Sequence, residues 1–419
     1  MNAALDSAVL PRSLQIETGI AAANAEFVAL RRDLHQHPEL AFAEHRTAGK
    51  VAALLQQWGY QVTTGIAGTG VVGSLRRGSS ERSLGLRADM DALPIQEATG
   101  LPYASQNPGV MHACGHDGHT AILLAAARFL ALYGQFDGTL QLIFQPAEET
   151  GSGARRMLEE GLFERFPCDA VFGLHNWPGV SCGHIGCIEG PAMASVDQAH
   201  ITVHGKGGHG AEPHNTVDPV LVSAHVITAL QSVVSRNVDP LDMGVLTVGS
   251  IHGGHASNVI PDRVELKLTA RTFRPEVRSL LQQRVPALVE AQAASFGARA
   301  EVDYRLGFPP VCNHPAETAL AREVAQDTLG AARVEEAFRP RRAQRGLCLH
   351  VAGTTGQFRV FRQWRQRRPA QPALRLQRRH PAAGRQLLGG PGRALPAAAT
   401  GGHITSDSQT HIAMDRAHA

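Results

Sequence analysis

One nine-residue stretch is denser in metal-binding side chains than any other part of the sequence. Residues Met111 to His119 read Met-His-Ala-Cys-Gly-His-Asp-Gly-His, which supplies one thiol, three imidazoles and one carboxylate. Such groups bind zinc and neighbouring divalent metals. The apolar run from Thr120 to Tyr133 predicts a helix that begins where this stretch ends. We therefore expect the ligands to lie on a short, stiff turn, as a catalytic metal site requires.

Three predicted strands lead into acidic residues or a histidine. These residues are Asp89 and Asp91 after strand 83–88, Glu148 and Glu149 after strand 140–144, and His175 after strand 169–174. In an open α/β sheet, ligands bind at the carboxyl ends of the strands. A glutamate that does not bind the metal is free to take a proton from activated water. The sequence therefore predicts one catalytic metal site at one edge of a sheet.

Composition sets the outer limits of the fold and of the location. The chain has 419 residues and is 43% hydrophobic, enough for two or three domains with their own cores. Residues 1–20 do not have the pattern of a signal peptide, and no apolar stretch is long enough to span a bilayer. The six cysteines lack the spacing of a disulfide framework. We expect a cytoplasmic protein that is not bound to a membrane.

The charge of the chain changes abruptly near residue 337. Residues 1–336 contain 25 Lys and Arg against 35 Asp and Glu, whereas residues 337–406 contain 14 Arg and no acidic residue. A basic arm of this kind is typical of nucleic-acid binding. However, it contains no lysine and few aromatic residues, and it resembles GC-rich DNA translated out of frame. We therefore favour an out-of-frame tail and expect no nucleic-acid partner.

The middle of the chain is predicted to form a separate unit. Its expected elements are strand 196–203, helix 217–235, strands 244–250 and 264–273, helix 275–296 and strand 299–306. This βαββαβ order is typical of a ferredoxin-like sandwich. A linker is expected over residues 183–191, and a glycine-rich turn precedes the first helix of the unit.

The overall prediction is an α/β fold in which an open mixed-sheet metallohydrolase domain carries an inserted ferredoxin-like α+β domain. The inserted domain would act as a lid and dimerisation domain. The expected boundaries are 1–190 for the first part of the catalytic domain, 191–303 for the inserted domain, 304–342 for the return to the catalytic domain and 343–419 for a tail without native structure.

Several motifs together resemble the aminoacylase/carboxypeptidase family of dinuclear-metal amidohydrolases. The resemblance is strongest to hippurate hydrolases, N-acyl-amino-acid amidohydrolases and auxin-conjugate hydrolases, and it covers about residues 25 to 340. The motifs are Leu34 to Leu40 (LHQHPEL), Arg87 to Pro94 (RADMDALP), Cys114 to His119 (CGHDGH), Phe144 to Glu149 (FQPAEE), Gly173 to Asn176 (GLHN), His209 to His214 (HGAEPH) and Asn258 to Pro261 (NVIP), with Arg271 following.

The resemblance implies a role for each matching residue of the catalytic domain. It implies that Cys114, His116, Glu149 and His175 bind two divalent metal ions, which would be manganese, zinc, cobalt or nickel. It also implies that Glu148 is the general base, which takes a proton from metal-bound water so that the resulting hydroxide attacks the amide. Asp91 would support the site from behind the ligands.

The inserted domain is implied to bind the substrate. By resemblance, His209 stabilises the oxyanion and reaches the site of a neighbouring subunit, whereas Asn258 and Arg271 clamp the substrate carboxylate. The implied enzyme is a homodimer or homotetramer, assembled through the lid domain, that hydrolyses N-acyl amino acids of the hippurate type.

The C-terminal part departs from the family pattern. Relatives carry a motif like Ser-Glu-Asp-Phe-Ala-Phe-Met-Leu and later Leu-His-Asn-Pro, whose histidine is a fifth protein ligand; this sequence has neither. Codons allowed for 344–352, read one nucleotide later, can spell the first motif with a following Gln, and the same shift over 369–372 can give Leu-His-Asn-Pro. A frameshift near Arg341 to Ala343 is therefore predicted, and we expect the chain as written to show little activity.

Two other classes of function remain open from the residues alone. One is a metal-free hydrolase in which Cys114 is the nucleophile, but this would leave Glu148, Glu149 and His175 without a role. The other is a non-catalytic binding protein that uses the basic C-terminal segment as its arm. Chelator sensitivity tests the first class, and salt-dependent retention of nucleic acid tests the second.

Overall fold

The structure is a computed structural model that describes residues 12–178, 180–335 and 355–361. Eight strands form a large sheet in the order β1-β2-β4-β3-β5-β16-β6-β15. Their bounds are β1 Gln61–Ile66, β2 Gly70–Arg77, β4 Gly138–Gln145, β3 Ser83–Asp89, β5 Ala170–His175, β16 Thr355–Phe361, β6 Ile185–Cys187 and β15 Val334–Glu335. Strands β4, β3, β5 and β16 run parallel to one another, whereas β1 pairs antiparallel with β2, β2 with β4, and β6 with β16. Strand β15 pairs with β6 in parallel. The expected open mixed sheet is therefore present.

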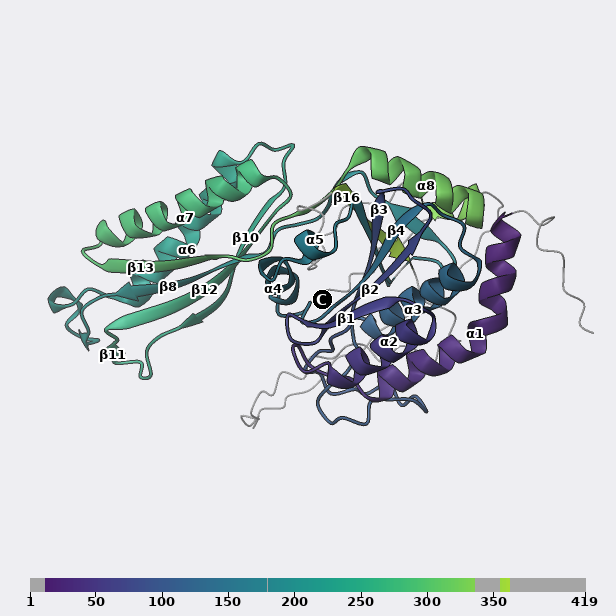
Figure 1. The fold of residues 1–419 in the computed structure, drawn as a ribbon. Coiled ribbons are helices and arrows are strands. Elements are labelled where there is room, and N and C mark those ends of the chain that lie inside the picture. Colours follow the sequence, from purple (N-terminus) through teal and green to yellow (C-terminus); the bar gives the residue numbers. More distant parts are fainter. Residues whose placement is uncertain (1–11, 179, 336–354, 362–419) are drawn as a thin grey trace, which may run out of the picture. The chain divides into compact units, whose positions relative to one another are not determined.

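Helices cover both faces of the large sheet. Helices α1 (Arg12–Gln36), α2 (His45–Gln57) and α3 (His116–Tyr133) lie together on one face (Figure 1), with α4 (Gly153–Glu159) and α5 (Leu162–Arg165) on the other. Strand β4 separates the two cores because successive side chains point to opposite faces. Leu142 and Phe144 pack with α2 and α3, whereas Ile143 packs with α4 and α5. Helix α8 (Pro315–Leu329) contacts the β6, β15 and β16 end of the sheet.

The parallel strands bring their polar ends to one edge. Strands β3 and β4 pair so that Asp89 lies opposite Gln145, and β5 runs parallel beside β3 and ends at His175. Helix α3 begins at this edge with His116. The edge that the sequence predicted as the site is thus built by three strands and one helix N-terminus.

A four-stranded antiparallel sheet, here called the small sheet, has the order β10-β12-β8-β13. Its strands are β8 Asp197–His204, β10 Gly244–His252, β12 Arg263–Thr272 and β13 Arg299–Leu306, and its helices are α6 Pro219–Asn237 and α7 Pro275–Ala294. Figure 1 shows both helices on one face of this sheet. Strand β12 alternates accordingly, with Val264, Leu266 and Leu268 buried and Glu265 and Lys267 exposed. The chain order β8-α6-β10-β12-α7-β13 is the predicted βαββαβ order.

The start of α6 shows how local sequence sets an element boundary. The Asp218 side chain accepts a hydrogen bond from the backbone N–H of Val220 at 2.8 Å, and Pro219 occupies the first helical turn. Both features favour a helix start. The observed helix begins two residues after the predicted one, which is the usual uncertainty of such a boundary.

Two regions differ from the sequence prediction. The expected linker over 183–191 contains β6 and the start of β7 (Gly190–Met193), which pairs with β14 (Val311–Asn313). Strands of three or four residues are too short to show a periodic pattern. Strand β16 lies in the segment that was expected to lack native structure, and it pairs with β5 and β6. Backbone hydrogen bonds form such a ladder largely independently of side-chain chemistry. The rest of 343–419 lies outside the described residues.

The remaining elements are short. A two-stranded ladder joins β9 (Gly208–His209) to β11 (Val259–Ile260), and single 3-10 turns lie at Pro213–Asn215 and Ala331–Arg333. None of the helices in the described part of the chain has the length and apolar character needed to cross a bilayer.

Candidate metal centre

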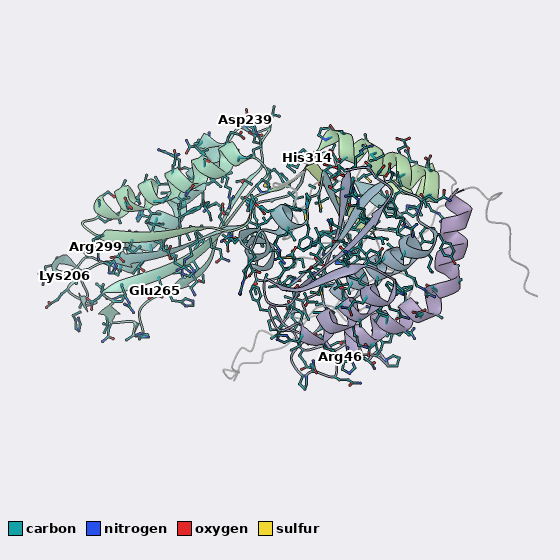
Figure 2. The ribbon with its side chains drawn as sticks, viewed as in Figure 1. Arg46, Lys206, Asp239, Glu265, Arg299 and His314 are labelled. Atoms are coloured by element: carbon teal, nitrogen blue, oxygen red, sulfur yellow. The ribbon has the colours of Figure 1, made fainter. Side chains whose placement is uncertain are left out.

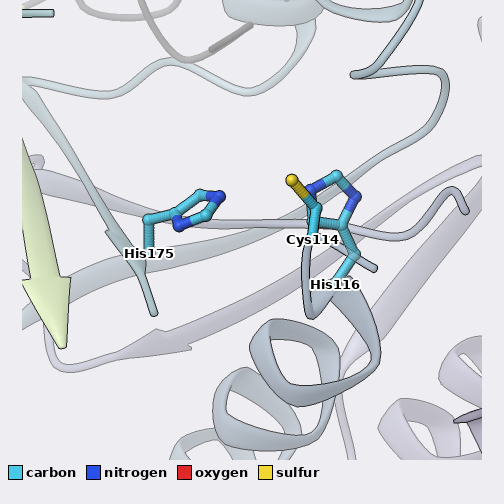
Figure 3. Close-up of side chains that lie close together, drawn as sticks. All are labelled: Cys114, His116 and His175. Atoms are coloured by element: carbon cyan, nitrogen blue, oxygen red, sulfur yellow. The ribbon is translucent and has the colours of Figure 1, made fainter. Parts of the chain in front are cut away.

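Cys114, His116 and His175 converge at the edge of the large sheet. Their possible ligand atoms all lie within 4.8 Å of one another. Figure 3 shows the Cys114 thiol pointing toward the space between the two imidazole rings. Gly115 makes this turn possible, because its φ of 81° lies in the left-handed region and a Cβ there would lie 2.5 Å from Nδ2 of Asn176. Three of the predicted ligands are therefore together.

Carboxylates complete this cluster around His116. Nε2 of His116 lies 3.6 Å from Oε1 of Glu149, 3.7 Å from Oδ2 of Asp89 and 3.9 Å from Oε2 of Glu148. These distances exceed those of hydrogen bonds. They suit atoms that share a cation, since nitrogen and oxygen ligands each lie about 2 Å from a zinc ion. The thiol, imidazole and carboxylate donors fit a divalent transition metal. The predicted ligand Glu149 lies in a second possible ligand group with His116 and Glu148, and His116 is shared with the group of Cys114 and His175.

Asp91 orients His116 and Glu149 through hydrogen bonds. Nδ1 of His116 donates to the Asp91 carbonyl oxygen at 2.8 Å and lies 3.2 Å from its carboxylate. The other carboxylate oxygen of Asp91 accepts from the backbone N–H of Glu149 at 2.9 Å. A hydrogen bond at Nδ1 fixes the tautomer that leaves Nε2 available to a metal. This is the arrangement that the predicted supporting role of Asp91 requires.

The electrostatics of the cluster also favour a bound cation. Burial by itself lowers the pKa of His116, but the negative charge of Asp89 and the hydrogen bond to Asp91 outweigh it and hold this pKa well above its ordinary value of 6.5. An imidazole that attracts a proton so strongly also attracts a metal ion that replaces the proton.

Sequence reasoning missed a second layer formed by Asp89, His119 and Asn176. Nδ1 of His119 lies 2.6 Å from Oδ1 of Asp89, and Nε2 of His119 lies 3.0 Å from the backbone nitrogen of Asn176 and 2.5 Å from its side-chain oxygen. Arg87 donates to the other oxygen of Asp89 at 2.6 Å. The side chains of Arg87, Asp89 and His119 are buried. One signal was available: His119 follows His116 by three residues on a helix, and such residues share a face.

A buried ionic group lies behind the N-terminus of α3. Oδ2 of Asp117 lies 2.7 Å from Nε of Arg31 and 2.8 Å from Nδ1 of His35, and Nε2 of His35 lies 3.3 Å from Glu97. Burial alone raises the pKa of Asp117, but His35, His112 and Arg31 overcome this effect and lower it. The ionised carboxylate is thus held in place next to a predicted ligand.

His112 in the same stretch has a different environment. Its side chain is buried, and neither ring nitrogen has a hydrogen-bond partner among the described residues. Burial lowers its pKa to about 4, so the ring is neutral at pH 7. Of the three histidines in the nine-residue stretch, only His116 lies with Cys114 and His175 in one possible ligand group.

The predicted substrate residues lie at two ends of the small sheet. Val259 pairs with His209 in the β9–β11 ladder, and Gly210 donates to the Asn258 carbonyl at 2.8 Å, so His209 and Asn258 are neighbours. Arg271 lies near the opposite end of β12, eight residues after Arg263, which corresponds to roughly 26 Å of strand. A single chain therefore does not bring Asn258 and Arg271 to the same carboxylate.

Comparison with known proteins agrees with the motif resemblance. The model of peptidase family M20/M25/M40 matches residues 85–344. The chain is 46% identical over 302 residues to N-acetyl-L-cysteine deacetylase from Bacillus subtilis, which covers 72% of each chain. It is 44% identical over 315 residues to hippurate hydrolase from Campylobacter jejuni, covering 75% of this chain and 82% of the relative.

A solved structure supports the same relationship. A dinuclear metal binding peptidase of the M20 family from Bacillus subtilis matches with a TM-score of 0.71 and 35% identity, covering 81% of this chain and 89% of that chain. The match to the family model spans more than half of the sequence, and the curated relatives are matched over most of their length. The chain therefore belongs to peptidase family M20/M25/M40.

Proposed function

We propose that this protein hydrolyses the amide bond of N-acyl amino acids in a metal-dependent reaction. The observation that carries the proposal is the convergence of Cys114, His116 and His175 with the carboxylates of Glu148 and Glu149. Relatives named for N-acetyl-L-cysteine deacetylation and hippurate hydrolysis support the substrate class. Both named substrates join an acyl group to the nitrogen of an amino acid that keeps its free carboxylate.

The residues of the site divide into ligands and a base. Cys114, His116, Glu149 and His175 would hold two divalent ions, which supply Lewis-acid activation of the carbonyl and of water when bound. Glu148, with Oε2 3.9 Å from Nε2 of His116, accepts the proton of the attacking water and passes it to the leaving nitrogen. The acyl group leaves as a carboxylic acid and the amino acid as its free amine.

The small sheet supplies the substrate contacts in this proposal. Arg271 is half-buried and offers a planar guanidinium for a carboxylate, while His209 and Asn258 lie at the far end of the same sheet. Because these two ends are too far apart to share one substrate, His209 and Asn258 are proposed to act in the site of a second subunit. The domain over 191–303 would then be both lid and dimerisation domain.

We also propose that the sequence from about residue 341 is out of frame. The acid-free segment and the missing motifs support this reading, and the match to the family model ends at residue 344. Apolar side chains are exposed between α3 and α8, where Leu320 and Val324 on α8 are 53% and 46% exposed. Such exposure is expected if a covering helix of the catalytic domain has been lost.

The decisive experiment compares two reading frames. The coding DNA around codons 338–346 is resequenced, and both the 419-residue chain and a frame-restored chain are purified without metal. Each is then assayed on N-benzoylglycine after addition of Mn²⁺, Zn²⁺, Co²⁺ or Ni²⁺. The proposal expects metal-dependent, chelator-sensitive hydrolysis by the frame-restored chain and little by the other. Activity that survives chelation would favour Cys114 as a nucleophile instead, and full activity of the 419-residue chain would overturn the frameshift.

A further inference from the structure

A carboxylate far from the metal ligands in sequence contacts the turn that carries Glu148 and Glu149. The Glu44 side chain is fully buried, and its Oε1 accepts a hydrogen bond from the backbone N–H of Ala147 at 2.8 Å. Its other oxygen accepts from the Thr69 hydroxyl. Burial is also the main reason that the pKa of Glu44 is raised. Burying a carboxyl group costs free energy unless hydrogen bonds or opposite charges compensate for its lost hydration.

The residue that Glu44 holds is in an unfavourable backbone conformation. Ala147 has a φ of 48°, in the left-handed region that side chains other than glycine rarely adopt. Further hydrogen bonds close the turn on its C-terminal side, from Gly153 N–H to Ala147 O at 3.1 Å and from Gly151 N–H to Glu148 O at 3.0 Å. The conformation of Ala147 sets the direction in which the chain leaves β4, and hence where the next two side chains point. Strained conformations of this kind persist only where neighbouring contacts enforce them.

We propose that Glu44 is a positioning residue of the metal centre, which holds Ala147 in the left-handed conformation and so places Glu148 and Glu149. The inference rests on the metal centre proposed above. Glu44 acts through Ala147 and does not touch the reacting atoms.

Glu39 provides a matched control in the same segment. Its carboxylate also accepts two backbone N–H groups, from Arg46 at 2.8 Å and from Thr47 at 2.9 Å. Those groups belong to the first turn of α2 and not to the turn that carries Glu148. Removing either carboxylate costs comparable hydrogen bonding, but only Glu44 is expected to affect the metal site.

The test is a Co²⁺ titration of both the full 419-residue chain and the frame-restored chain, monitored by the absorption of the cobalt–thiolate bond to Cys114. Glu44→Ala is expected to weaken Co²⁺ binding by roughly 10–100-fold, as second-layer changes at metal sites do. Glu44→Gln keeps an oxygen for Ala147 N–H and should stay within about threefold of wild type. Glu39→Ala should leave the affinity unchanged. Glu44→Ala combined with Ala147→Gly should recover much of the loss, because glycine accepts the left-handed conformation without strain.

The outcomes separate the two proposals. If neither the 419-residue chain nor the frame-restored chain shows a cobalt–thiolate band, the metal centre itself is refuted. If either chain shows the band, but in that chain Glu44→Ala and Glu39→Ala weaken binding equally or Ala147→Gly fails to compensate, the positioning role is wrong. Should Glu44→Ala not fold, Glu44→Asp takes its place, since the shorter side chain does not reach Ala147. Cobalt affinity equal to wild type in Glu44→Asp would likewise overturn the inference.

Discussion

The two main sheets of this protein differ in where most of their ionisable residues lie. At the edge of the large sheet, Asp89 and His116 are fully buried, and each lies within 4 Å of oppositely charged partners. On the small sheet, most charges lie on the exposed face, where Arg299 pairs with Glu301 along one strand. Asp197, at the start of β8, is a buried exception that pairs with Arg278. Figure 2 shows the side chains of Glu265 and Arg299 on this sheet. Buried charges are kept only where their interactions offset desolvation, so the large-sheet edge has the character of a site.

This contrast also separates chemistry from recognition. In the proposed function, the large sheet brings together the groups that would exchange protons and bind cations, whereas the small sheet presents the groups that would contact a ligand or another chain. Each prediction below tests one side of this difference.

The largest effect is expected at Glu148. In the frame-restored protein, Glu148→Gln should reduce kcat by about 10²–10⁴-fold, because the amide does not accept a proton from water. Metal content, measured by inductively coupled plasma mass spectrometry, should remain near that of wild type. Glu149→Gln is the matched variant and should lose metal. The opposite result would show that the base and the ligand have been exchanged.

The buried ionic group should matter far more for folding than the surface pairs. Asp117→Asn leaves Arg31 and His35 facing a neutral side chain, and it should lower the free energy of unfolding at pH 7 by about 3–5 kcal/mol. Because the pKa of Asp117 is lowered in the folded protein, this stabilisation is present above pH 3.8 and is lost as the pH falls below it. Glu301→Gln on the small sheet should cause no measurable change in urea unfolding. Equal losses would contradict the contrast.

His112 should make the catalytic domain sensitive to mild acid. Its folded pKa of about 4 lies below the unfolded value of 6.5, so the unfolded chain takes up the proton first. Stability is therefore lost as the pH falls from 6.5 to 4, by about 3 kcal/mol in all. His112→Phe removes this proton uptake, and its unfolding free energy should fall less over the same range. Parallel pH profiles for the two proteins would show that His112 does not titrate in this way.

The smallest effect is expected at the substrate clamp. In the frame-restored protein, Arg271→Ala should lower kcat/KM for an N-acyl amino acid roughly 30-fold. This corresponds to a loss of about 2 kcal/mol of transition-state stabilisation, as expected for a hydrogen bond to a charged group. The corresponding N-acyl amino acid amide should be hydrolysed slowly by wild type and little affected by the change. Arg263→Ala, at the other end of the same strand, is the control. Equal wild-type rates on the acid and the amide would remove the basis of the clamp.

Much of the site was predictable because its residues follow strands or begin a helix. His175 ends β5, Asp89 ends β3, and His116 begins α3, so hydrophobic patterns alone placed them at one edge. Contacts between distant segments were not predictable in this way. Glu44 and Ala147 are 103 residues apart, and neither belongs to a periodic pattern that reveals the contact.

The small sheet shows the same limit. Its element order was predicted correctly, since each strand and helix has its own periodic pattern. Asn258 precedes β12 and Arg271 lies near its end, so their separation follows from the length of the predicted strand. The pairing of β9 with β11, which brings His209 beside Asn258, was not predictable, because a single sequence gives no direct information on strand pairing.

The glycine between the two predicted ligands has a consequence for variation at this site. Gly115 combines a left-handed backbone with a neighbouring Asn176 side chain that leaves no room for a Cβ. In a library of all single substitutions, position 115 should accept glycine alone, although glycine offers nothing to a metal or a substrate. Such a library would thus show position 115 to be as intolerant of substitution as Cys114 and His116. The reason would be the backbone conformation at Gly115 and not the chemistry of a side chain.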